Sequence, residues 1–183
     1  MKTIVKIFFL LFLPFIMRGQ YVLELHSEAD DSFREWEIIL EKDSTEIEGT
    51  LRLTWGIDND WSDWQYSIEE LDGEISQKFN NNPGLWELRS DNKIVTISQV
   101  WPGDPTEWKI QCEGRKFTIR TIYSNQLDEW TLGEQALGEL VVYTETQGDP
   151  RDWIVSDYML DQFSFEERMA AVFIALFTSI PKF

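Results

Sequence analysis

A short acidic stretch in the first half of the chain has the residue types and spacing of a calcium-binding loop. Such a loop places oxygen ligands at positions 1, 3, 5 and 12, and the chain has four suitable residues at these offsets: Asp58, Asp60, Ser62 and Glu69. Position 6, where the loop must turn sharply, is Asp63 rather than glycine, and residues 64–68 alternate as a strand would. The stretch is therefore a candidate calcium site, with a solvated hairpin loop as the alternative.

Two later acidic segments have nearly the same sequence. Residues 103–108 read GDPTEW, and residues 148–153 read GDPRDW. Loops carry binding more often than the strands that hold them, so Asp104, Asp149 and Asp152 are candidate contacts for a partner. The alternative is that each Asp-Pro pair starts a turn and each tryptophan anchors the strand that follows.

The residue types that most enzyme mechanisms need are scarce. His26 is the only histidine and Cys112 the only cysteine, which excludes a two-histidine mechanism, an intramolecular disulfide and a cysteine-based metal cluster. Cys112 is predicted to be a buried thiol on a strand, and His26 a surface residue. The sequence has no G-x-S-x-G, no H-E-x-x-H and no phosphate-binding glycine loop. A hydrolase acting through carboxylates alone would need acidic residues clustered on the inward face of the strands, and the predicted inward positions hold almost none. We therefore expect a non-enzymatic protein.

The start of the chain has the pattern of a secretory signal peptide over residues 1–19. Lys2 and Lys6 precede an apolar run over residues 7–17. This run is shorter than the roughly 20 residues of a membrane span, so cleavage and export are predicted, with a retained N-terminal anchor as the alternative. A secreted or periplasmic single domain would then occupy residues 20–183.

The chain is strongly acidic, with 16 basic against 33 acidic residues and a formal net charge of −17. The predicted leader contains three of the basic residues and none of the acidic ones, so the exported chain would be more acidic still. This charge repels nucleic acid and anionic membranes. The negative charge favours basic proteins or divalent cations as binding partners, through a long-range attraction that salt weakens. The alternative is that the charge serves only to keep the protein in solution.

Tryptophans recur with a period that fits one β-hairpin per unit. Spacings of 28, 22, 22, 22 and 23 residues separate the members of the series Trp36, Trp64, Trp86, Trp108, Trp130 and Trp153. Each tryptophan starts a strand on which inward apolar residues alternate with outward polar ones, as in residues 108–112 (WKIQC). Return strands are predicted at residues 47–55, 94–101, 117–123 and 140–144, and turns at 72–73, 91–92, 113–114 and near Gly138.

Six tryptophan strands, one return strand between each consecutive pair of them, and an opening strand over residues 21–25 make twelve strands in an antiparallel meander. One face of the meander is consistently apolar, so the sheet must close around something. Eight strands enclose a space that side chains alone fill, whereas twelve leave room for a helix about 10–12 Å across.

The last segment supplies that helix. Ser164 and Glu167 form a capping box, every residue from Met169 to Phe177 is apolar, and Pro181 ends the helix, which is predicted over residues 164–179. A helix that is apolar all round must be buried on all sides. The residues expected to fill the barrel are Met169, Val172, Phe173, Leu176 and Phe177. The predicted fold is an all-β barrel of about twelve antiparallel strands wrapped around one buried C-terminal helix.

The order of these elements resembles the tubby-like C-terminal superfamily, which includes phospholipid scramblases and LURP-one-related proteins. The likeness lies mainly in residues 107–183. There, residues 107–110 (EWKI) lead to residues 114–119 (GRKFTI), and residues 152–155 (DWIV) precede the terminal helix. The resemblance implies a closed twelve-stranded barrel threaded by a hydrophobic C-terminal helix.

The family's ligands transfer poorly to this chain. Tubby domains bind phosphoinositides through basic residues, and no basic cluster matches them here. Scramblase-like proteins have an acidic calcium segment before the helix. In this chain the same region holds four aspartates at a different spacing, namely Asp149, Asp152, Asp157 and Asp161.

Two functions remain open from the sequence. The first is an exported, non-enzymatic barrel that binds a protein, glycan or lipid through its loops. The second is a calycin-like carrier of a small apolar ligand or lipid, with the helix packed outside and a cavity lined by tryptophans, namely Trp64, Trp86, Trp108 and Trp130. No cofactor is expected beyond the candidate calcium ion.

Overall fold

A computed structural model describes residues 21–28, 32–42, 45–55, 60–80, 82–91 and 93–182. The predicted signal peptide and the first calcium candidate, Asp58, lie outside these residues. Among the described residues, no helix is long and apolar enough to cross a membrane.

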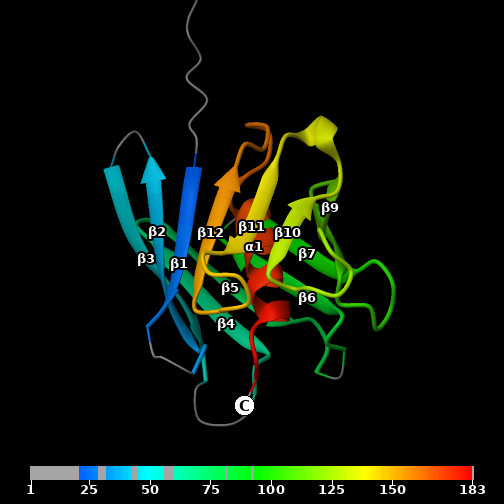
Figure 1. Cartoon of the computed structure of the whole chain (residues 1–183), viewed down its shortest axis with the longest axis horizontal. Helices are drawn as coiled ribbons and strands as arrows, with labels where there is room; N and C mark the ends of the chain where they lie inside the picture. The colour runs from blue at the N-terminus through cyan, green and yellow to red at the C-terminus, as the bar shows by residue number, and fades with distance from the viewer. Residues whose placement is uncertain are drawn as a thin grey trace, which may run out of the picture.

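The described chain forms a closed barrel of twelve antiparallel strands in which each strand pairs with its neighbours in sequence, and β1 closes the ring against β12 (Figure 1). The strands are β1 (Tyr21–Ser27), β2 (Glu35–Lys42), β3 (Thr45–Leu53), β4 (Asp63–Ile68), β5 (Leu71–Gln77), β6 (Leu85–Ser90), β7 (Lys93–Gln99), β8 (Glu107–Cys112), β9 (Arg115–Thr121), β10 (Glu129–Leu132), β11 (Leu140–Thr144) and β12 (Asp152–Asp157). A short 3-10 helix, η1 (Gln135–Leu137), precedes β11, and α1 (Phe165–Ser179) ends the fold. The predicted fold class is confirmed.

Helix α1, drawn in red in Figure 1, lies inside the barrel. Of the predicted filling residues, Met169, Val172, Phe173 and Leu176 are at most 1% exposed, and Phe177 is partly buried against the same core. The rings of Trp64 and Trp86 pack edge-on against Phe173 and Phe177, with centroid separations of 4.6–6.4 Å. The carrier with its helix outside and a tryptophan-lined cavity is therefore wrong, because the helix occupies the space next to these rings.

The period-2 pattern places the strands as expected, except that β3, β7 and β9 end two residues before the predicted ends at Trp55, Trp101 and Tyr123, which belong to loops. All six tryptophans of the series lie on even-numbered strands and are at most 2% exposed. Cys112 is buried on β8, as predicted. Inward residues from all twelve strands and from α1 form one contiguous apolar core.

One predicted turn is wrong. The β4–β5 turn is made by Glu69 and Glu70 rather than by Asp72 and Gly73, which lie within β5. Gly73 faces the ring of Tyr66 across the strand pair, and a Cβ atom there would lie 2.4–2.5 Å from that ring. The glycine is therefore explained by a close packing contact, not by a turn. Glu69 instead takes the positive φ of 52° that the turn requires.

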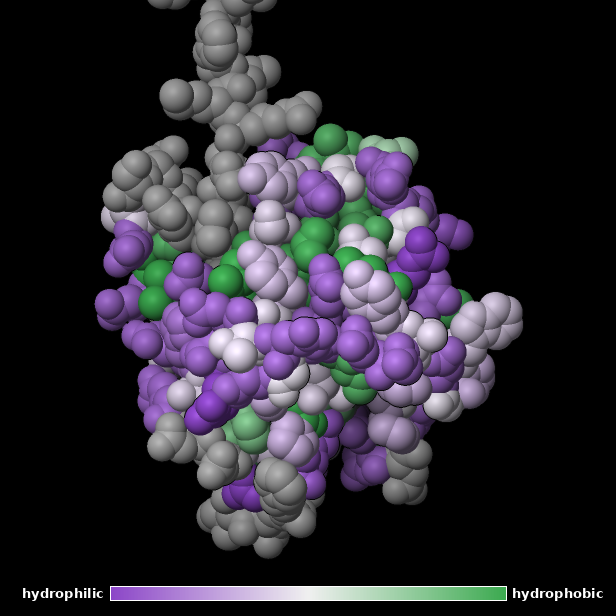
Figure 2. Space-filling view, viewed as in Figure 1, coloured by the Kyte–Doolittle hydropathy of each residue, from purple (hydrophilic) through white to green (hydrophobic). Residues whose placement is uncertain are grey.

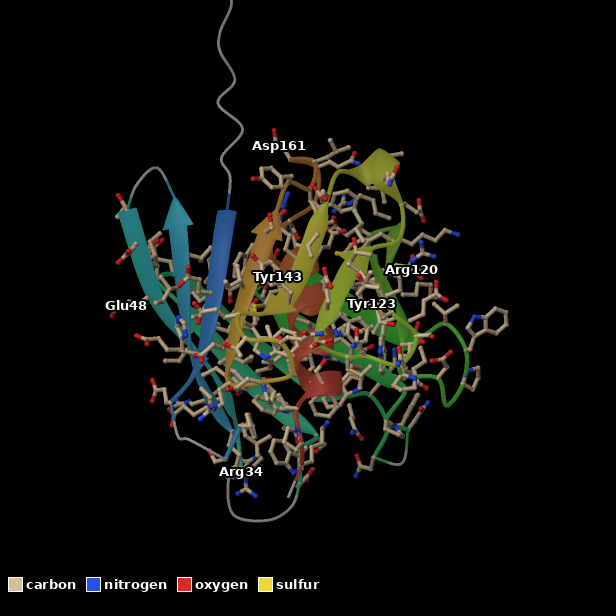
Figure 3. All side chains as sticks on the ribbon, viewed as in Figure 1. Arg34, Glu48, Arg120, Tyr123, Tyr143 and Asp161 are labelled. Atoms are coloured by element: carbon tan, nitrogen blue, oxygen red, sulfur yellow. The ribbon has the colours of Figure 1, made fainter. Side chains whose placement is uncertain are left out.

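The two ends of the barrel differ in construction. One end, which we call the rim, carries the six longer loops that lead into the tryptophan strands, and α1 ends there at Ser179. The other, the hairpin end, carries the turns between β4 and β5, β6 and β7, and β8 and β9, and α1 begins there. Arg34 marks the rim and Asp161 the hairpin end in Figure 3.

At the hairpin end, charged residues of the first helical turn bind the barrel wall. Glu167 is 1% exposed and accepts hydrogen bonds from the Arg115 guanidinium at 3.0 and 3.2 Å and from the Ser164 backbone N–H at 2.8 Å. Arg168 donates to both carboxylate oxygens of Asp157 on β12 at 2.9 Å. A buried charge is tolerated when it is paired and hydrogen-bonded, so these contacts fix the entry of α1 into the barrel.

Candidate functional site

All six rim loops are built around the same tryptophan hydrogen bond. The indole N–H donates to the backbone carbonyl three residues earlier, over 2.8–3.2 Å, in the pairs Trp36–Phe33, Trp64–Trp61, Trp86–Pro83, Trp108–Pro105, Trp130–Leu127 and Trp153–Pro150. In every rim loop, the backbone N–H of the first loop residue also donates to the backbone carbonyl of the first residue of the next strand. A buried indole N–H needs such a partner, so each tryptophan ties its loop to the core.

A second repeated contact, local to each loop, engages three of the acidic loop residues. Four residues before the tryptophan, an Asp or Asn side chain accepts a hydrogen bond from the backbone N–H two residues further on, over 2.9–3.2 Å. This contact occurs at Asp60, Asn82, Asp104 and Asp149. This local bond, an Asx turn, is a common way for these side chains to start a turn. The side chain of the residue two positions later, Ser62, Thr106 or Arg151, also binds the carboxylate, and together these bonds lower the pKa values of the three aspartates.

The predicted contact residues are thus occupied within the fold. Asp104 and Asp149 hold turns, which confirms the alternative interpretation of the Asp-Pro segments. Asp152 accepts a hydrogen bond from His26 Nδ1 at 2.9 Å across the β1–β12 seam. This bond raises the pKa of His26 above its usual value of 6.5.

The candidate calcium ligands are not brought together. Asp60 and Ser62 precede β4, whereas Glu69 follows it, and a six-residue strand separates their ends by about 20 Å. The Ser62 hydroxyl is within 3.3 Å of Asp63, its sequence neighbour. Glu69 therefore cannot share an ion with Asp60, and within the described chain no three His, Cys, Asp or Glu residues are grouped for a metal.

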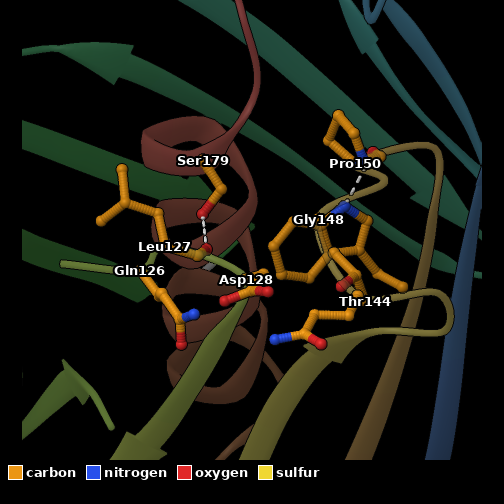
Figure 4. A pocket seen from close by; sticks show the side chains of 9 residues that line it. Gln126, Leu127, Asp128, Thr144, Gly148, Pro150 and Ser179 are labelled. Atoms are coloured by element: carbon orange, nitrogen blue, oxygen red, sulfur yellow. Dashed lines mark hydrogen bonds between the residues drawn. The ribbon is translucent and has the colours of Figure 1, made fainter. Parts of the chain in front are cut away.

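A polar groove opens on the rim between the loop 122–128 and the loop 145–151 (Figure 4). It has a volume of about 360 Å³, within the usual size range of small-molecule sites. We call it the rim groove. Its lining residues are Gln126, Leu127, Asp128, Thr144, Gln147, Gly148, Pro150, Trp153 and Ser179.

The rim groove lies where the loop repeat departs from its pattern. Gln126 takes the place of the Asx residue, and no Asx-turn bond is formed in its loop. Among the described residues, no side-chain hydrogen bond or ion pair engages Gln126, Asp128 or Gln147. These side chains therefore keep their hydrogen-bonding capacity available to a ligand, unlike the aspartates that hold turns.

The floor of the rim groove is fixed by the end of the helix. The Ser179 hydroxyl lies 2.7 Å from the Ala175 carbonyl and also contacts the Leu127 carbonyl, and it accepts the Trp130 indole N–H at 3.1 Å. The Thr144 backbone N–H donates to the Asp128 carbonyl at 3.0 Å and so joins the two walls. In Figure 4, Gln126 and Thr144 come from opposite sides of the groove, with Asp128 between them.

A second groove, of about 530 Å³, lies on the barrel wall over β3 to β6. Its lining carries charges of both signs, including Arg52, Asp72, Glu74 and Arg89. Arg89 is paired with Glu87, and the Tyr66 ring that reaches the groove is only 2% exposed, with a pKa raised by burial. Its polar groups are thus those of a charged sheet surface, and it is the weaker candidate.

The sequence interpretation missed an exposed aromatic residue seven positions before three of the tryptophans. Phe79, Trp101 and Tyr123 are 59%, 64% and 53% exposed, and they are 22 residues apart. Each opens a β-turn, because its carbonyl accepts the N–H of the residue three further on. These three residues could have been identified from the sequence, because they recur with the same 22-residue period as the buried tryptophans.

Comparison with models of protein families, with curated proteins and with solved structures gives no match. The chemistry of the site therefore rests on the residues just described. On this face hydrophobic residues lie in separate groups among hydrophilic ones (Figure 2). At the rim groove, polar side chains without a described side-chain partner line a cavity between two loops.

Proposed function

We propose that this protein is an exported, non-enzymatic β-barrel that binds one unit of a neutral sugar in the rim groove. The observation that carries the proposal is the contrast between Asp128 and the turn-forming aspartates. Asp104 and Asp149 are engaged by their own loops, whereas Asp128, Gln126 and Gln147 face a cavity with no described side-chain partner. A ligand that offers several hydroxyl groups would satisfy them.

The chemistry of the lining fits hydroxyl groups well. A carboxylate accepts two O–H bonds, and each glutamine amide both donates and accepts, which matches adjacent sugar hydroxyls that do the same. Hydrogen bonds to a charged acceptor are also stronger than those between neutral groups. An anionic sugar is disfavoured, because Asp128 and the net charge of −17 would repel it.

A non-enzymatic role is supported by the state of the buried carboxylates. Glu87, Asp157 and Glu167 are each bound to a basic side chain, and Asp128 has no second acidic residue beside it in the lining of the rim groove, so these residues offer no pair of general acid and base. Export rests on the leader pattern of the sequence alone. Membership of the tubby-like superfamily is likewise a proposal, supported by the order of the elements and the position of the helix.

The proposal can be tested by titrating the purified chain with a panel of neutral monosaccharides in a calorimeter. The variant Asp128→Asn should weaken binding about tenfold or more, because the stronger charged acceptor is lost. Asp104→Asn is the matched control and should bind like the parent, since Asn82 already fills the equivalent position. Equal binding by both variants, or no binding of any sugar in the panel, would refute the rim groove as a sugar site.

A further inference from the structure

The exposed aromatic residues form a row that begins at the rim groove. Tyr123 belongs to the same loop as Gln126 and Asp128, which line the groove. Trp101 and Phe79 occupy the equivalent position in the next two loops around the barrel. We call these three residues the aromatic row.

The identical turns fix the spacing of the row. Neighbouring loops of the rim are two strands apart, which corresponds to about 9–10 Å at the usual separation of paired strands. Gln99 joins two of the loops, because its side-chain oxygen accepts the Gly103 N–H at 3.0 Å while its backbone N–H donates to the Gly84 carbonyl at 2.9 Å. The aromatic rings are therefore held by turns that are themselves anchored, so stacking on them would order little of the chain.

The rings stand apart from one another and are surrounded by polar groups. Asn82 and Asp104 lie in the same turns as Phe79 and Trp101. A protein partner usually buries a continuous apolar centre, which separate rings among polar residues do not offer. A sugar chain has the complementary character, since each pyranose ring presents C–H groups on its faces and hydroxyls at its edges.

We propose that the ligand is an extended, neutral oligosaccharide that places one unit in the rim groove and stacks further units on Tyr123, Trp101 and Phe79. This inference rests on the proposed function, and it adds the class of ligand and its direction across the rim. The spacing of the row is comparable to the length of two linked pyranose units. Chains that carry uronic acids or sulfates are excluded by the same negative charge that favours neutral ones.

The test measures affinity against chain length for the neutral sugar series whose monosaccharide binds best. For the parent protein, a hexasaccharide should bind at least about tenfold more tightly than the monosaccharide. Trp101→Ala should remove most of this gain while leaving the monosaccharide affinity unchanged. Trp101→Phe should keep it, and Ile94→Ala, at an exposed apolar residue of the hairpin end, should have no effect.

The outcomes separate this inference from the proposed function. If the hexasaccharide binds no better than the monosaccharide, or Trp101→Ala weakens the binding of both equally, stacking on the aromatic row is refuted. Binding of a single sugar unit in the rim groove is not refuted by that result. If no sugar of any length binds, both are refuted. If the chain instead co-sediments with zwitterionic vesicles in a manner that needs Trp101, the row is a membrane contact and the oligosaccharide is refuted.

Discussion

The rim and the hairpin end use acidic residues in opposite ways. At the hairpin end, Asp157 and Glu167 hold the helix to the wall through Arg168 and Arg115, so each carboxylate joins elements that are far apart in sequence. At the rim, aspartates such as Asp104 bind a residue two positions away and shape only their own loop. The stability of the barrel therefore depends on the hairpin end more than on the rim.

This division leaves the rim open to variation. Because each loop has its own buried indole and its own local hydrogen bonds, its exposed residues can change while these anchors stay in place. The loop 122–128 illustrates this, since it keeps the Trp130 indole bond to Leu127 but has Gln126 where four of the other loops have Asp or Asn. The groove lies beside that change.

The largest effect is expected from a substitution in the helix, because both ends of the barrel are attached to it. Phe173→Asp should yield insoluble or unfolded protein, because an ionised carboxylate would enter a closed apolar core and the aromatic packing would be lost at about 3–5 kcal/mol. That loss alone is comparable with the total stability of about 5–15 kcal/mol of a typical domain. Phe173→Leu is the control and should remain soluble. A Phe173→Asp protein that melts cooperatively would place the helix outside the core.

The next prediction concerns the hairpin end alone. Asp157→Ala should lower the free energy of unfolding by about 3–5 kcal/mol, because it leaves the largely buried Arg168 guanidinium without its carboxylate. Urea denaturation measures this. Asp161→Ala, at an exposed residue of the same end, should stay within about 0.5 kcal/mol of the parent. Equal effects of the two substitutions would show that the ion pair does not anchor the helix.

The corresponding change at the rim should be smaller. Asn82→Ala removes one Asx-turn bond, and we expect a loss of about 1 kcal/mol in the same denaturation experiment. Asn82→Asp should be nearly neutral, because aspartate fills this position in three other loops. A loss from Asn82→Ala as large as that from Asp157→Ala would contradict the local role of the Asx turns.

The smallest effect is expected at the barrel seam. Hydrogen bonding to Asp152 raises the pKa of His26 in the folded protein, so its contribution is complete below pH 6.5 and is lost as the pH rises through the higher folded-state pKa. The pair is half-exposed, which limits the contribution to less than about 1 kcal/mol. His26→Gln should flatten the dependence of stability on pH just above 6.5. An unchanged pH dependence in this variant would remove His26 as its source.

The fold could be predicted from the sequence because its patterns are strong and local. The tryptophan period, the two-residue alternation and the wholly apolar helix each restrict the choice of structure, and they agree with one another. The β4–β5 turn was missed because Gly73 resembles a turn residue, whereas the Tyr66 ring that requires the glycine is known only once the strands are paired.

The site was less accessible to sequence reasoning. The Asp-Pro pair predicted a turn at Asp104, but nothing in the chain distinguishes Asp128, which faces a cavity, from the many other acidic residues. That distinction depends on which neighbours lie within hydrogen-bonding distance, and the ion pairs Arg115–Glu167 and Arg168–Asp157 depend on contacts across the closed barrel. The three residues of the aromatic row recur every 22 residues in the sequence, but this repeat was overlooked beside the longer series of buried tryptophans.

A neutral sugar is proposed to bind at the rim, in the groove between the loops 122–128 and 145–151. An NMR titration of the isotope-labelled chain with the best-binding monosaccharide tests it directly, since backbone amide shifts report the place of binding. We expect saturable shifts in these two loops and in Thr144, with residues 157–168 at the hairpin end unchanged. Shifts centred on the hairpin end or on the wall groove over β3 to β6 would contradict it.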